Sequence, residues 1–269
     1  MTDQSDRDTW MMRAQQRPMA PVTPVTPEAL EELERAAAHV RGGGLLIVPT
    51  DTVYGIGALA SDPAAVARLL AAKGRGRQMP PPVLVAGPDQ LAGVVADIPS
   101  AARALIEAHW PGALTLVLTA APDLGWNLGE TGGTIAVRMP DHPLTLSLLR
   151  ATGPMAVTSA NRTGEPPATD AAAARAAFPS GAPLGGHDDD SGGVLVLDGG
   201  PTPGPVPSTI VSLAADRALA PVVLRDGVLA RAALAAAVDP VLRAAGAAPL
   251  ADATGRHDGQ HGEPREVGA

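Results

Sequence analysis

Residues 45–57 read Leu45-Leu-Ile-Val-Pro49-Thr-Asp-Thr-Val-Tyr-Gly55-Ile-Gly57. The four apolar residues at the start have the length and the β-branched character of a strand that is buried on both faces. Pro49 lacks a backbone donor and ends the regular ladder, and hydroxyl groups, one carboxylate and the only tyrosine of the chain follow it. A polar loop after a buried strand is typical of a small-molecule site in an α/β protein, but a hairpin loop that satisfies its own backbone with Thr and Asp has the same composition.

Helical and extended segments alternate on both sides of this stretch. Apolar residues at helical spacing and short β-branched runs mark the two kinds of segment, and Asp62-Pro63 is a typical helix start. The pattern predicts helices over residues 28–41, 62–72, 101–108, 142–151 and 170–178 and from Gly227 onward, and strands over 83–85, 114–118, 134–140, 155–157, 194–197, 208–211 and 222–225. This alternation predicts an α/β fold, in which polar residues at the strand exits are expected to gather on one rim of the sheet.

The composition narrows the function classes. The 269 residues carry a net charge of −8, which argues against overall attraction to nucleic acid or to anionic membranes, so any basic site must be local. The absence of cysteine excludes disulfides, thiolate catalysis and Cys-type zinc sites, and no histidine pair in a structured segment has the spacing of zinc ligands. No signal peptide and no apolar run of ~18 residues is visible, so a soluble, cytoplasmic protein without membrane contact is expected.

Three parts are expected along the chain. Residues 1–26 are rich in proline and lack helical periodicity, so they are predicted to be a disordered N-terminal tail. Residues 27–230 carry the alternating elements and are predicted to form the folded domain. Residues 231–269 begin with an Ala-rich helix and continue, from about residue 246, as a disordered C-terminal tail. A mobile surface insertion is predicted over residues 180–193.

A run of three cations, Lys73-Gly-Arg75-Gly-Arg77, follows the helix predicted over residues 62–72. Lys73 is the only lysine of a chain that otherwise uses arginine, and the two glycines let the backbone approach a ligand closely. The run suits a polyphosphate group, which arginine forks and a lysine point charge would bind. The alternative is a basic helix C-terminus that complements the helix dipole and is followed by a flexible turn.

Generic nucleotide and hydrolase motifs do not fit. Gly55-x-Gly57-x-x-Ala60 matches the loose dinucleotide pattern, but roughly twenty residues later, where that pattern needs an acidic residue, the chain has the basic run. There is no P-loop, because Lys73 precedes its glycines, and neither Ser159 nor Ser208 lies in a nucleophile elbow. Without an obvious nucleophile or histidine base, the residues favour chemistry by positioning and charge neutralisation, as in attack on an ATP phosphate.

Seven segments, taken in order, resemble the YrdC/Sua5 family: Pro49-Thr-Asp-Thr-Val-Tyr-Gly55, Lys73-Gly-Arg75, Trp110-Pro-Gly-Ala-Leu-Thr-Leu116, Val137-Arg-Met-Pro140, Ser159-Ala-Asn161, Pro207-Ser-Thr209 and Leu224-Arg-Asp-Gly227. The resemblance covers about residues 27–230 and is to the short, single-domain bacterial type. It implies a twisted mixed parallel/antiparallel sheet with flanking helices around a deep, positively charged cavity. It also implies the activity of an L-threonylcarbamoyladenylate synthase, a nucleotidyltransferase that makes threonylcarbamoyl-AMP and pyrophosphate from L-threonine, bicarbonate and ATP for the t6A37 modification of tRNA.

The resemblance also implies roles for individual residues. The implied catalytic residues are Lys73, Arg75, Ser159 and Asn161. The implied L-threonine contacts are Thr52, Arg138, Ser159 and Ser208. The implied ATP contacts are Lys73, Arg75, Thr134, Asn161, Thr169 and Arg225. Mg²⁺ would enter with ATP, and no tightly bound metal is expected.

The resemblance further implies partners, and it leaves two rival functions to be weighed. The product would pass to a downstream tRNA threonylcarbamoyl transferase complex, and weak tRNA binding is a further expectation. One rival is a double-stranded RNA-binding or ribosome-maturation factor, which the net charge of −8 and the scarcity of aromatic residues for stacking disfavour. The other is carbamoyl transfer on the same fold in metalloenzyme maturation, where such proteins usually carry zinc-finger and acylphosphatase modules that a cysteine-free chain of this length does not provide.

Overall fold

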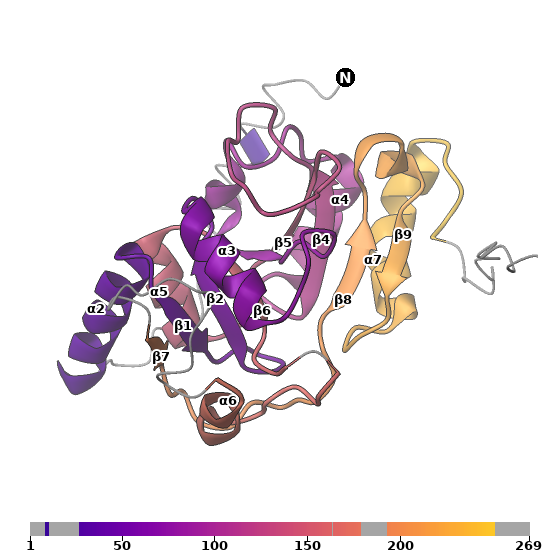
Figure 1. Cartoon of the computed structure of the whole chain (residues 1–269). Coiled ribbons are helices and arrows are strands. Elements are labelled where there is room, and N and C mark those ends of the chain that lie inside the picture. The colour runs from indigo at the N-terminus through magenta and orange to yellow at the C-terminus, as the bar shows by residue number, and fades with distance from the viewer. Residues whose placement is uncertain (1–8, 11–26, 163, 179–192, 251–269) are drawn as a thin grey trace, which may run out of the picture.

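The structure is a computed structural model that describes residues 9–10, 27–162, 164–178 and 193–250 (Figure 1). Its strands are β1 (Leu45–Val48), β2 (Gly55–Leu59), β3 (Val83–Leu84), β4 (Leu114–Thr119), β5 (Thr134–Arg138), β6 (Met155–Ser159), β7 (Val194–Val196), β8 (Thr209–Ser212) and β9 (Val222–Arg225). They form one nine-stranded sheet in the order β7-β1-β2-β6-β3-β5-β4-β8-β9. The sheet combines parallel pairs, such as β1 with β7, and antiparallel pairs, such as β2 with β6, which confirms the predicted mixed sheet.

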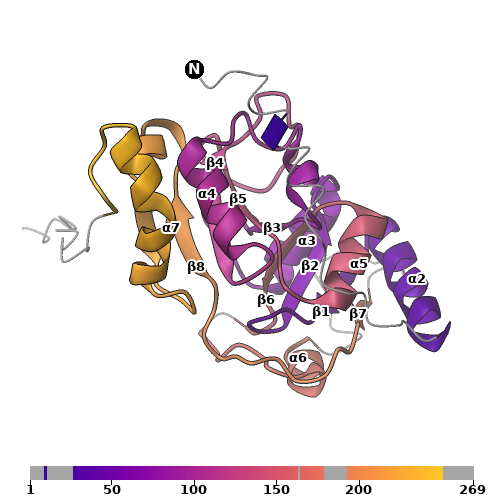
Figure 2. The ribbon, with the colours of Figure 1, turned by 180° about the vertical axis from the view of Figure 1, so that it is seen from behind.

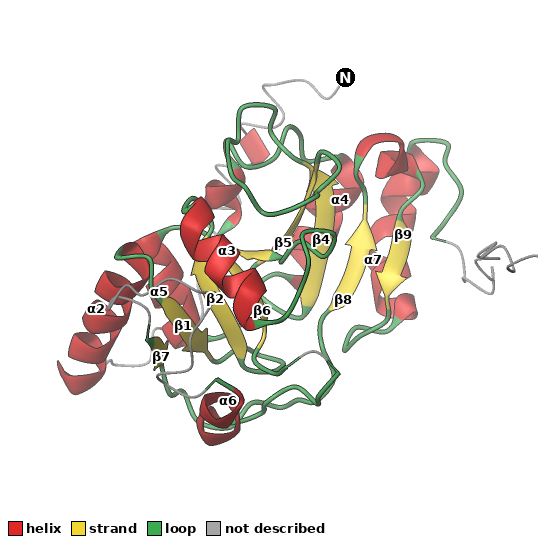
Figure 3. Ribbon diagram, viewed as in Figure 1, coloured by secondary structure: helices red, strands yellow, loops and turns green. Residues whose placement is uncertain are grey.

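Helices cover both faces of this sheet (Figure 3). The α-helices are α2 (Pro27–Arg41), α3 (Pro63–Ala72), α4 (Ser100–His109), α5 (Pro143–Thr152), α6 (Ala171–Ala177) and α7 (Arg231–Ala244), with short 3-10 helices η1 (Pro88–Leu91) and η2 (Ala215–Leu219). The view in Figure 2 shows α7 beside α4 at one end of the sheet and α5 beside α2 at the other. Every predicted helix is present, and the predicted bounds differ mostly by one or two residues from those observed.

The burial of β1 on both faces of the sheet explains why its sequence is apolar throughout. Leu45 and Ile47 belong to the larger hydrophobic cluster, which also contains residues of α3 and α4. Leu46 and Val48 belong to a second cluster with residues of α2 and α5. All four residues are buried, as predicted for a strand that is covered on both faces.

The strand β2 is the main element that the sequence did not predict. It follows the loop 49–54 and pairs antiparallel with β1, so that Val48 lies opposite Gly55. Two of its five residues are glycines because the neighbouring β6 leaves no room for a side chain: a Cβ atom on Gly55 would lie 2.5 Å from Val157 Cγ1, and one on Gly57 would lie 2.6 Å from Val157 Cγ2. The glycines therefore serve strand packing and not a dinucleotide-binding turn.

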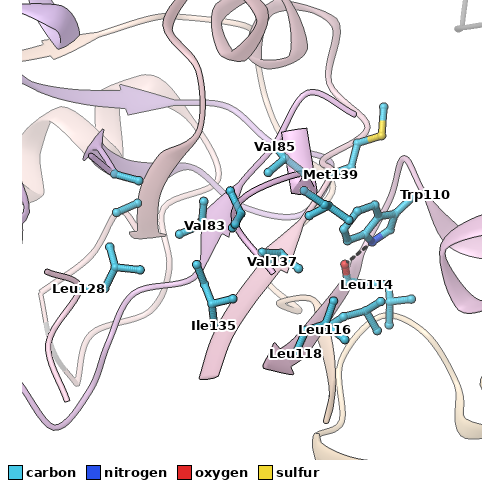
Figure 4. Close-up of a cluster of buried hydrophobic side chains, with 14 of the residues drawn as sticks. Val83, Val85, Trp110, Leu114, Leu116, Leu118, Leu128, Ile135, Val137 and Met139 are labelled. Carbon is cyan, nitrogen blue, oxygen red and sulfur yellow. Dashed lines mark hydrogen bonds between the residues drawn. The ribbon is translucent and has the colours of Figure 1, made fainter. Parts of the chain in front are cut away.

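The centre of the larger cluster is built mainly from aliphatic side chains (Figure 4). Trp110, which is 4% exposed, lies at one side of this cluster beside Met139 and Leu114. The indole Nε1 of Trp110 donates a hydrogen bond of 2.8 Å to the carbonyl oxygen of Leu114, so its buried polar atom is satisfied. This packing fixes the start of β4, next to which Gly112 contributes to the site described below.

Two expected boundaries need correction. Trp10, inside the predicted N-terminal tail, is 8% exposed and packs on the larger cluster, where its Nε1 donates to Glu107 Oε1 of α4 at 2.6 Å. At the other end, Ala247 and Leu250 pack against the same cluster, so the chain stays in contact with the domain beyond residue 246. The helix α7 buries Leu234, Val238 and Leu242. The predicted insertion over 180–193 lies outside the described residues except for Gly193.

None of the described helices combines the length and the hydrophobicity that a membrane-spanning segment needs.

Candidate active site

The loop 49–54 is organised by one hydroxyl group. Thr50 Oγ1 accepts hydrogen bonds from the backbone nitrogens of Thr52 at 3.1 Å and Val53 at 3.2 Å, and it donates to the carbonyl oxygen of Val53 at 2.6 Å. The loop therefore satisfies its own backbone, as the hairpin alternative predicts. It also presents the side chains of Asp51 and Thr52 to Arg138, whereas the small-molecule site stays a prediction.

Arg138, at the end of β5, is held on three of its nitrogens. Its Nε donates to the carbonyl oxygen of Gly112 at 3.0 Å, Nη1 to Thr52 Oγ1 at 3.1 Å and Nη2 to Asp51 Oδ1 at 2.6 Å. The same carboxylate oxygen accepts from the backbone nitrogen of Asp141 at 3.0 Å. Burial lowers the pKa of Arg138, and the charge of Asp51 opposes that shift. Of the five N–H groups that a guanidinium carries, these three bonds use three and leave one on Nη1 and one on Nη2.

The hydroxyl of Thr52 stays available to a ligand. Thr50 Oγ1 donates its one hydrogen to the carbonyl oxygen of Val53 and accepts from two backbone nitrogens, which uses its donor and both of its lone pairs. The 3.0 Å contact between Thr50 Oγ1 and Thr52 Oγ1 therefore has no fixed donor. Thr52 accepts from Arg138 Nη1, which leaves its hydroxyl one lone pair and its own hydrogen.

Lys73 caps the C-terminus of α3, and its side chain turns inward. Its Nζ donates to the carbonyl oxygen of Ser159 at 2.7 Å and to the carbonyl oxygen of Asn161, and Asn161 Oδ1 lies 3.4 Å away. The side chain is 2% exposed. Burial first, and then the charge of Arg75, lower the pKa of Lys73 to about 8, while Glu165 opposes the shift. Lys73 is a helix-end cation, as the second alternative for the basic run predicts, and it also contacts the end of β6, whereas phosphate binding stays a prediction.

Two further arginines, Arg75 and Arg225, lie close enough to Lys73 and Arg138 for their charges to interact. Arg75 Nη1 donates to Thr158 Oγ1 at 2.8 Å, while its buried Nε has no partner among the described residues. Arg225, at the end of β9, donates from Nε and Nη2 to the carbonyl oxygen of Ser208 at 3.1 and 2.8 Å. Burial lowers the pKa of both arginines, and the charges of Arg138 and Arg75 lower that of Arg225 further. We call Lys73, Arg75, Arg138 and Arg225 the cation cluster.

Thr169 and Thr134 complete the set of ten site residues predicted from the sequence. The carbonyl oxygen of Thr169 accepts from the backbone nitrogen of Thr202 at 2.8 Å, and its methyl group lies against Gly204, whose nitrogen donates to the carbonyl oxygen of Thr52 at 2.7 Å. The hydroxyl of Thr134 makes a local bond, in which Oγ1 donates to the carbonyl oxygen of Thr131 at 2.8 Å. Thr134 lies at the start of β5, so no described hydrogen bond joins it to the other nine residues.

The sheet register places Thr134 at the same end of the sheet as Ser159, whose carbonyl oxygen accepts from Lys73 of the basic run. Val83 of β3 pairs with Val137 of β5 and with Ala156 of β6. Because β3 runs parallel to β5 and antiparallel to β6, Thr134 and Ser159 lie at the same end of the sheet.

No role was predicted from the sequence for three residues of the site, Asp51, Thr115 and Thr158, although each lies in or next to a quoted motif. Asp51 holds Arg138, Thr158 binds Arg75, and Thr115 Oγ1 lies 2.9 Å from Ser208 Oγ. The available signal was their position: Asp51 and Thr115 lie inside two of the quoted segments, and Thr158 directly precedes a third. Each is a polar residue that is mostly or fully buried, and the described structure gives each a charged or hydroxyl partner.

Comparison with known proteins finds relatives of this chain. The Sua5_yciO_yrdC family model, described as "Telomere recombination", matches residues 38–227. The threonylcarbamoyl-AMP synthase of Bacillus subtilis (strain 168) is 39% identical over 210 residues, which cover 77% of this chain and 56% of that protein. A Mycobacterium tuberculosis (strain ATCC 25618 / H37Rv) relative, which carries the same name provisionally, is 49% identical over 192 residues, 71% of this chain and 82% of its own length.

Solved structures show the same fold. A double-substituted variant of Pyrococcus abyssi Sua5 matches with a TM-score of 0.69 and 34% identity over 80% of this chain and 59% of that one. P. abyssi Sua5 complexed with L-threonine matches with a TM-score of 0.63 and 35% identity over 73% of this chain and 54% of that one. The chain therefore spans little more than half of Sua5. From the matched sheet, the quoted segments and the family model, the chain belongs to the Sua5/YciO/YrdC family.

Proposed function

We propose that this chain is an L-threonylcarbamoyladenylate synthase, which joins L-threonine, bicarbonate and ATP and releases pyrophosphate. The observation that carries the proposal is Arg138, whose two remaining N–H groups lie on its two terminal nitrogens within the cation cluster. Two parallel N–H donors are what a carboxylate accepts from an arginine fork. The names of the B. subtilis and P. abyssi relatives, and the P. abyssi complex with L-threonine, support the same substrate.

The donor and acceptor pattern orients the amino acid. Its carboxylate is proposed to lie on Arg138, because that side chain offers donors only. Thr52 is proposed to contact L-threonine beside Arg138, whose Nη1 donates to the Thr52 hydroxyl. Ser159 and Ser208 are proposed as the remaining threonine contacts.

The other cations are proposed to bind the triphosphate of ATP. Lys73, Arg75 and Arg225 have lowered pKa values, caused first by burial and in Lys73 and Arg225 also by neighbouring positive charge. A polyanion among these cations would oppose this lowering, because a nearby negative charge favours the charged form of each side chain. Thr134, Asn161 and Thr169 are proposed to contact the nucleotide as well.

The proposed chemistry needs positioning and charge neutralisation. A carbamate oxygen of N-carboxythreonine, formed from the threonine amine and bicarbonate with loss of water, attacks the α-phosphorus of ATP. The bond from that phosphorus to the bridging oxygen breaks, and pyrophosphate leaves with the electron pair. Lys73, Arg75 and Arg225 neutralise the charge that grows on the leaving group, and the bonds of Lys73 to Ser159 and Asn161 hold that ammonium in place.

Mg²⁺ is proposed to accompany ATP. Among the described residues no group of three or more His, Asp or Glu side chains could hold a metal ion. This donor set does not fit a metal bound by the protein alone, but it fits a cation held chiefly by phosphate oxygens and water. Mg²⁺ would there supply further neutralisation of the phosphates.

The product is proposed to serve the t6A37 modification of tRNA. A downstream tRNA threonylcarbamoyl transferase complex is proposed to consume it, and the reaction is proposed to take place in the cytoplasm. Weak tRNA binding is proposed to be local to the cation cluster, since the chain as a whole carries a net charge of −8.

Pyrophosphate release tests the proposal directly. Release should require L-threonine, bicarbonate and ATP together, and mass spectrometry should find an AMP adduct that carries both the threonine and the carbonate carbon. Release of orthophosphate in place of pyrophosphate, or turnover without threonine, would contradict the proposal. Arg175→Ala, which removes an exposed cation from α6, is a control for the loss of one positive charge.

A further inference from the structure

Asp51 is an acidic side chain that bonds directly to Arg138 of the cation cluster, and the proposed function gives it no task. Its Oδ1 accepts from Arg138 Nη2 at 2.6 Å and from the backbone nitrogen of Asp141 at 3.0 Å. The side chains are well covered, with 16% of Asp51 and 8% of Arg138 exposed. One carboxylate oxygen thus joins the loop 49–54 to the segment that follows β5.

The three bonds of Arg138 fix its guanidinium in space. A planar group that is held at Nε by Gly112, at Nη1 by Thr52 and at Nη2 by Asp51 cannot rotate about Cζ or tilt without breaking a bond. The two remaining N–H groups therefore have a set direction. Without Asp51, the Nη2 end would lose its charged anchor, and repulsion from Arg225 would act on it unopposed.

We propose that Asp51 is a positioning residue, which fixes the guanidinium of Arg138 so that its last two N–H groups form the fork for the carboxylate of the amino acid substrate. The proposal rests on the proposed function, because it names how that site recognises its amino acid. Asp51 touches Arg138 and the backbone, so it acts on the substrate through Arg138.

The alternative is that Asp51 serves only to neutralise Arg138. The two roles predict opposite changes when the carboxylate is removed. A neutralising Asp51 weakens the attraction of Arg138 for an anion, so its loss should tighten the binding of threonine. A positioning Asp51 keeps the fork aligned, so its loss should weaken threonine binding although the site becomes more positive.

The test uses the full chain with Asp51→Asn, Asp51→Ala and, as a matched control, Asp123→Asn. Asparagine can still accept from Arg138 but without charge, alanine cannot accept at all, and Asp123 is an exposed residue on the loop between β4 and β5. Titration calorimetry measures the binding of L-threonine and of L-threoninamide, which lacks the carboxylate. Pyrophosphate release gives KM for threonine and for ATP, and thermal unfolding shows whether each variant is folded.

For Asp51→Asn, which weakens the charge-assisted bond to Arg138, we expect the Kd and KM for threonine to rise about 3- to 10-fold. For Asp51→Ala, which removes that bond, we expect both constants to rise about 10- to 100-fold. KM for ATP should stay within about twofold, and the preference for threonine over threoninamide should fall by the same factor as the affinity for threonine. A general folding defect would leave that preference unchanged. Asp123→Asn should equal the wild type.

Tighter or unchanged threonine binding in Asp51→Asn overturns the proposal, as does a parallel loss for threonine and threoninamide. The binding experiment separates this inference from the proposed function. If the wild-type protein binds threonine but releases no pyrophosphate, the proposed function is contradicted. The binding of threonine by the Asp51 variants would still show whether Asp51 positions Arg138 for the carboxylate. A wild-type protein that does not discriminate threonine from threoninamide overturns both.

Discussion

Lys73 Nζ lies 2.7 Å from the carbonyl oxygen of Ser159, so the single lysine of the chain joins the C-terminus of α3 to the end of β6. A cation at a helix end is ordinarily exposed, but this one is 2% exposed and also donates to the carbonyl oxygen of Asn161. The contact gives Lys73 two tasks, since it satisfies carbonyl groups of the sheet end and holds a positive charge beside Arg75. Substitutions at this position should therefore change both stability and kinetics.

Lys73→Ala should lower kcat/KM for ATP by about ten- to a few hundred-fold, the loss of one charge-assisted contact of about 1.5–3 kcal/mol. It should also lower the free energy of unfolding by about 1–2 kcal/mol, because it leaves buried carbonyl groups without a donor. Steady-state kinetics and chemical denaturation on the same variant measure the two effects. A stability loss with normal ATP kinetics would leave Lys73 as a purely structural cap, and Arg175→Ala controls for the loss of a cation.

The activity should depend on the charge of Lys73. Its pKa is lowered from 10.5 to about 8, so kcat/KM for ATP, which reports the free enzyme, should fall as the pH rises through about 8. Stability should respond in the opposite sense: between these two values the folded chain binds fewer protons than the unfolded chain, so this group's contribution to stability rises with pH. A pH–rate profile checks the first point, and a profile that is flat between pH 7 and 9, about one unit either side of that value, would argue against a catalytic charge at Lys73.

Arg138→Lys should not be a conservative change. A lysine has one nitrogen, so it cannot replace the bonds that Arg138 makes at once to Gly112, Thr52 and Asp51, and it cannot form a fork on a carboxylate. We expect KM for threonine to rise about 10- to 100-fold, KM for ATP to change far less, and the melting temperature to fall. Equal losses for both substrates would mark Arg138 as a general structural residue.

Trp10→Ala should destabilise the protein, although Trp10 lies within the predicted N-terminal tail. The indole is buried on the larger cluster, donates to Glu107 at 2.6 Å and lies 5.7 Å from the guanidinium carbon of Arg103. We expect a loss of about 2–4 kcal/mol in the free energy of unfolding with little change in KM for either substrate. Deletion of residues 1–8, which keeps Trp10, is the matched control and should leave the melting temperature unchanged.

Gly55→Ala should destabilise the hairpin of β1 and β2, and Val157→Ala should restore part of the loss. The added methyl group would lie 2.5 Å from Val157 Cγ1 but 3.4 Å from the nearest backbone atom, so trimming the valine removes the main clash. In Gly57→Ala the backbone oxygen of Ala156 lies 2.7 Å away and cannot be trimmed, so Val157→Ala should rescue that variant less. A double-mutant cycle by denaturation would show equal rescue at both positions if the steric account is wrong.

Local patterns predicted the regular elements well where a single physical preference dominates. The Asp62 cap is observed, with Oδ1 accepting from the nitrogens of Ala64 and Ala65 at 2.9 and 3.0 Å, and β1 is buried as its apolar run indicates. The strand β2 escaped prediction because Gly55 and Gly57 have low strand propensity. Their presence there depends on Val157, about a hundred residues later in the sequence, which only the paired sheet brings next to them.

The sequence by itself determined the α/β class, the polar strand exits, the candidate residues and, through the order of its quoted segments, the family. Those features depend on residue types and on neighbours within a few positions, which the chain carries locally. The tertiary structure decided which of these residues meet: Asp51 with Arg138, Lys73 with Ser159, and Ser208 with Arg225. Such pairings follow from the strand order and register, which are set by packing over the whole domain, so burial, the lowered pKa values and the direction of each hydrogen bond are properties of the fold.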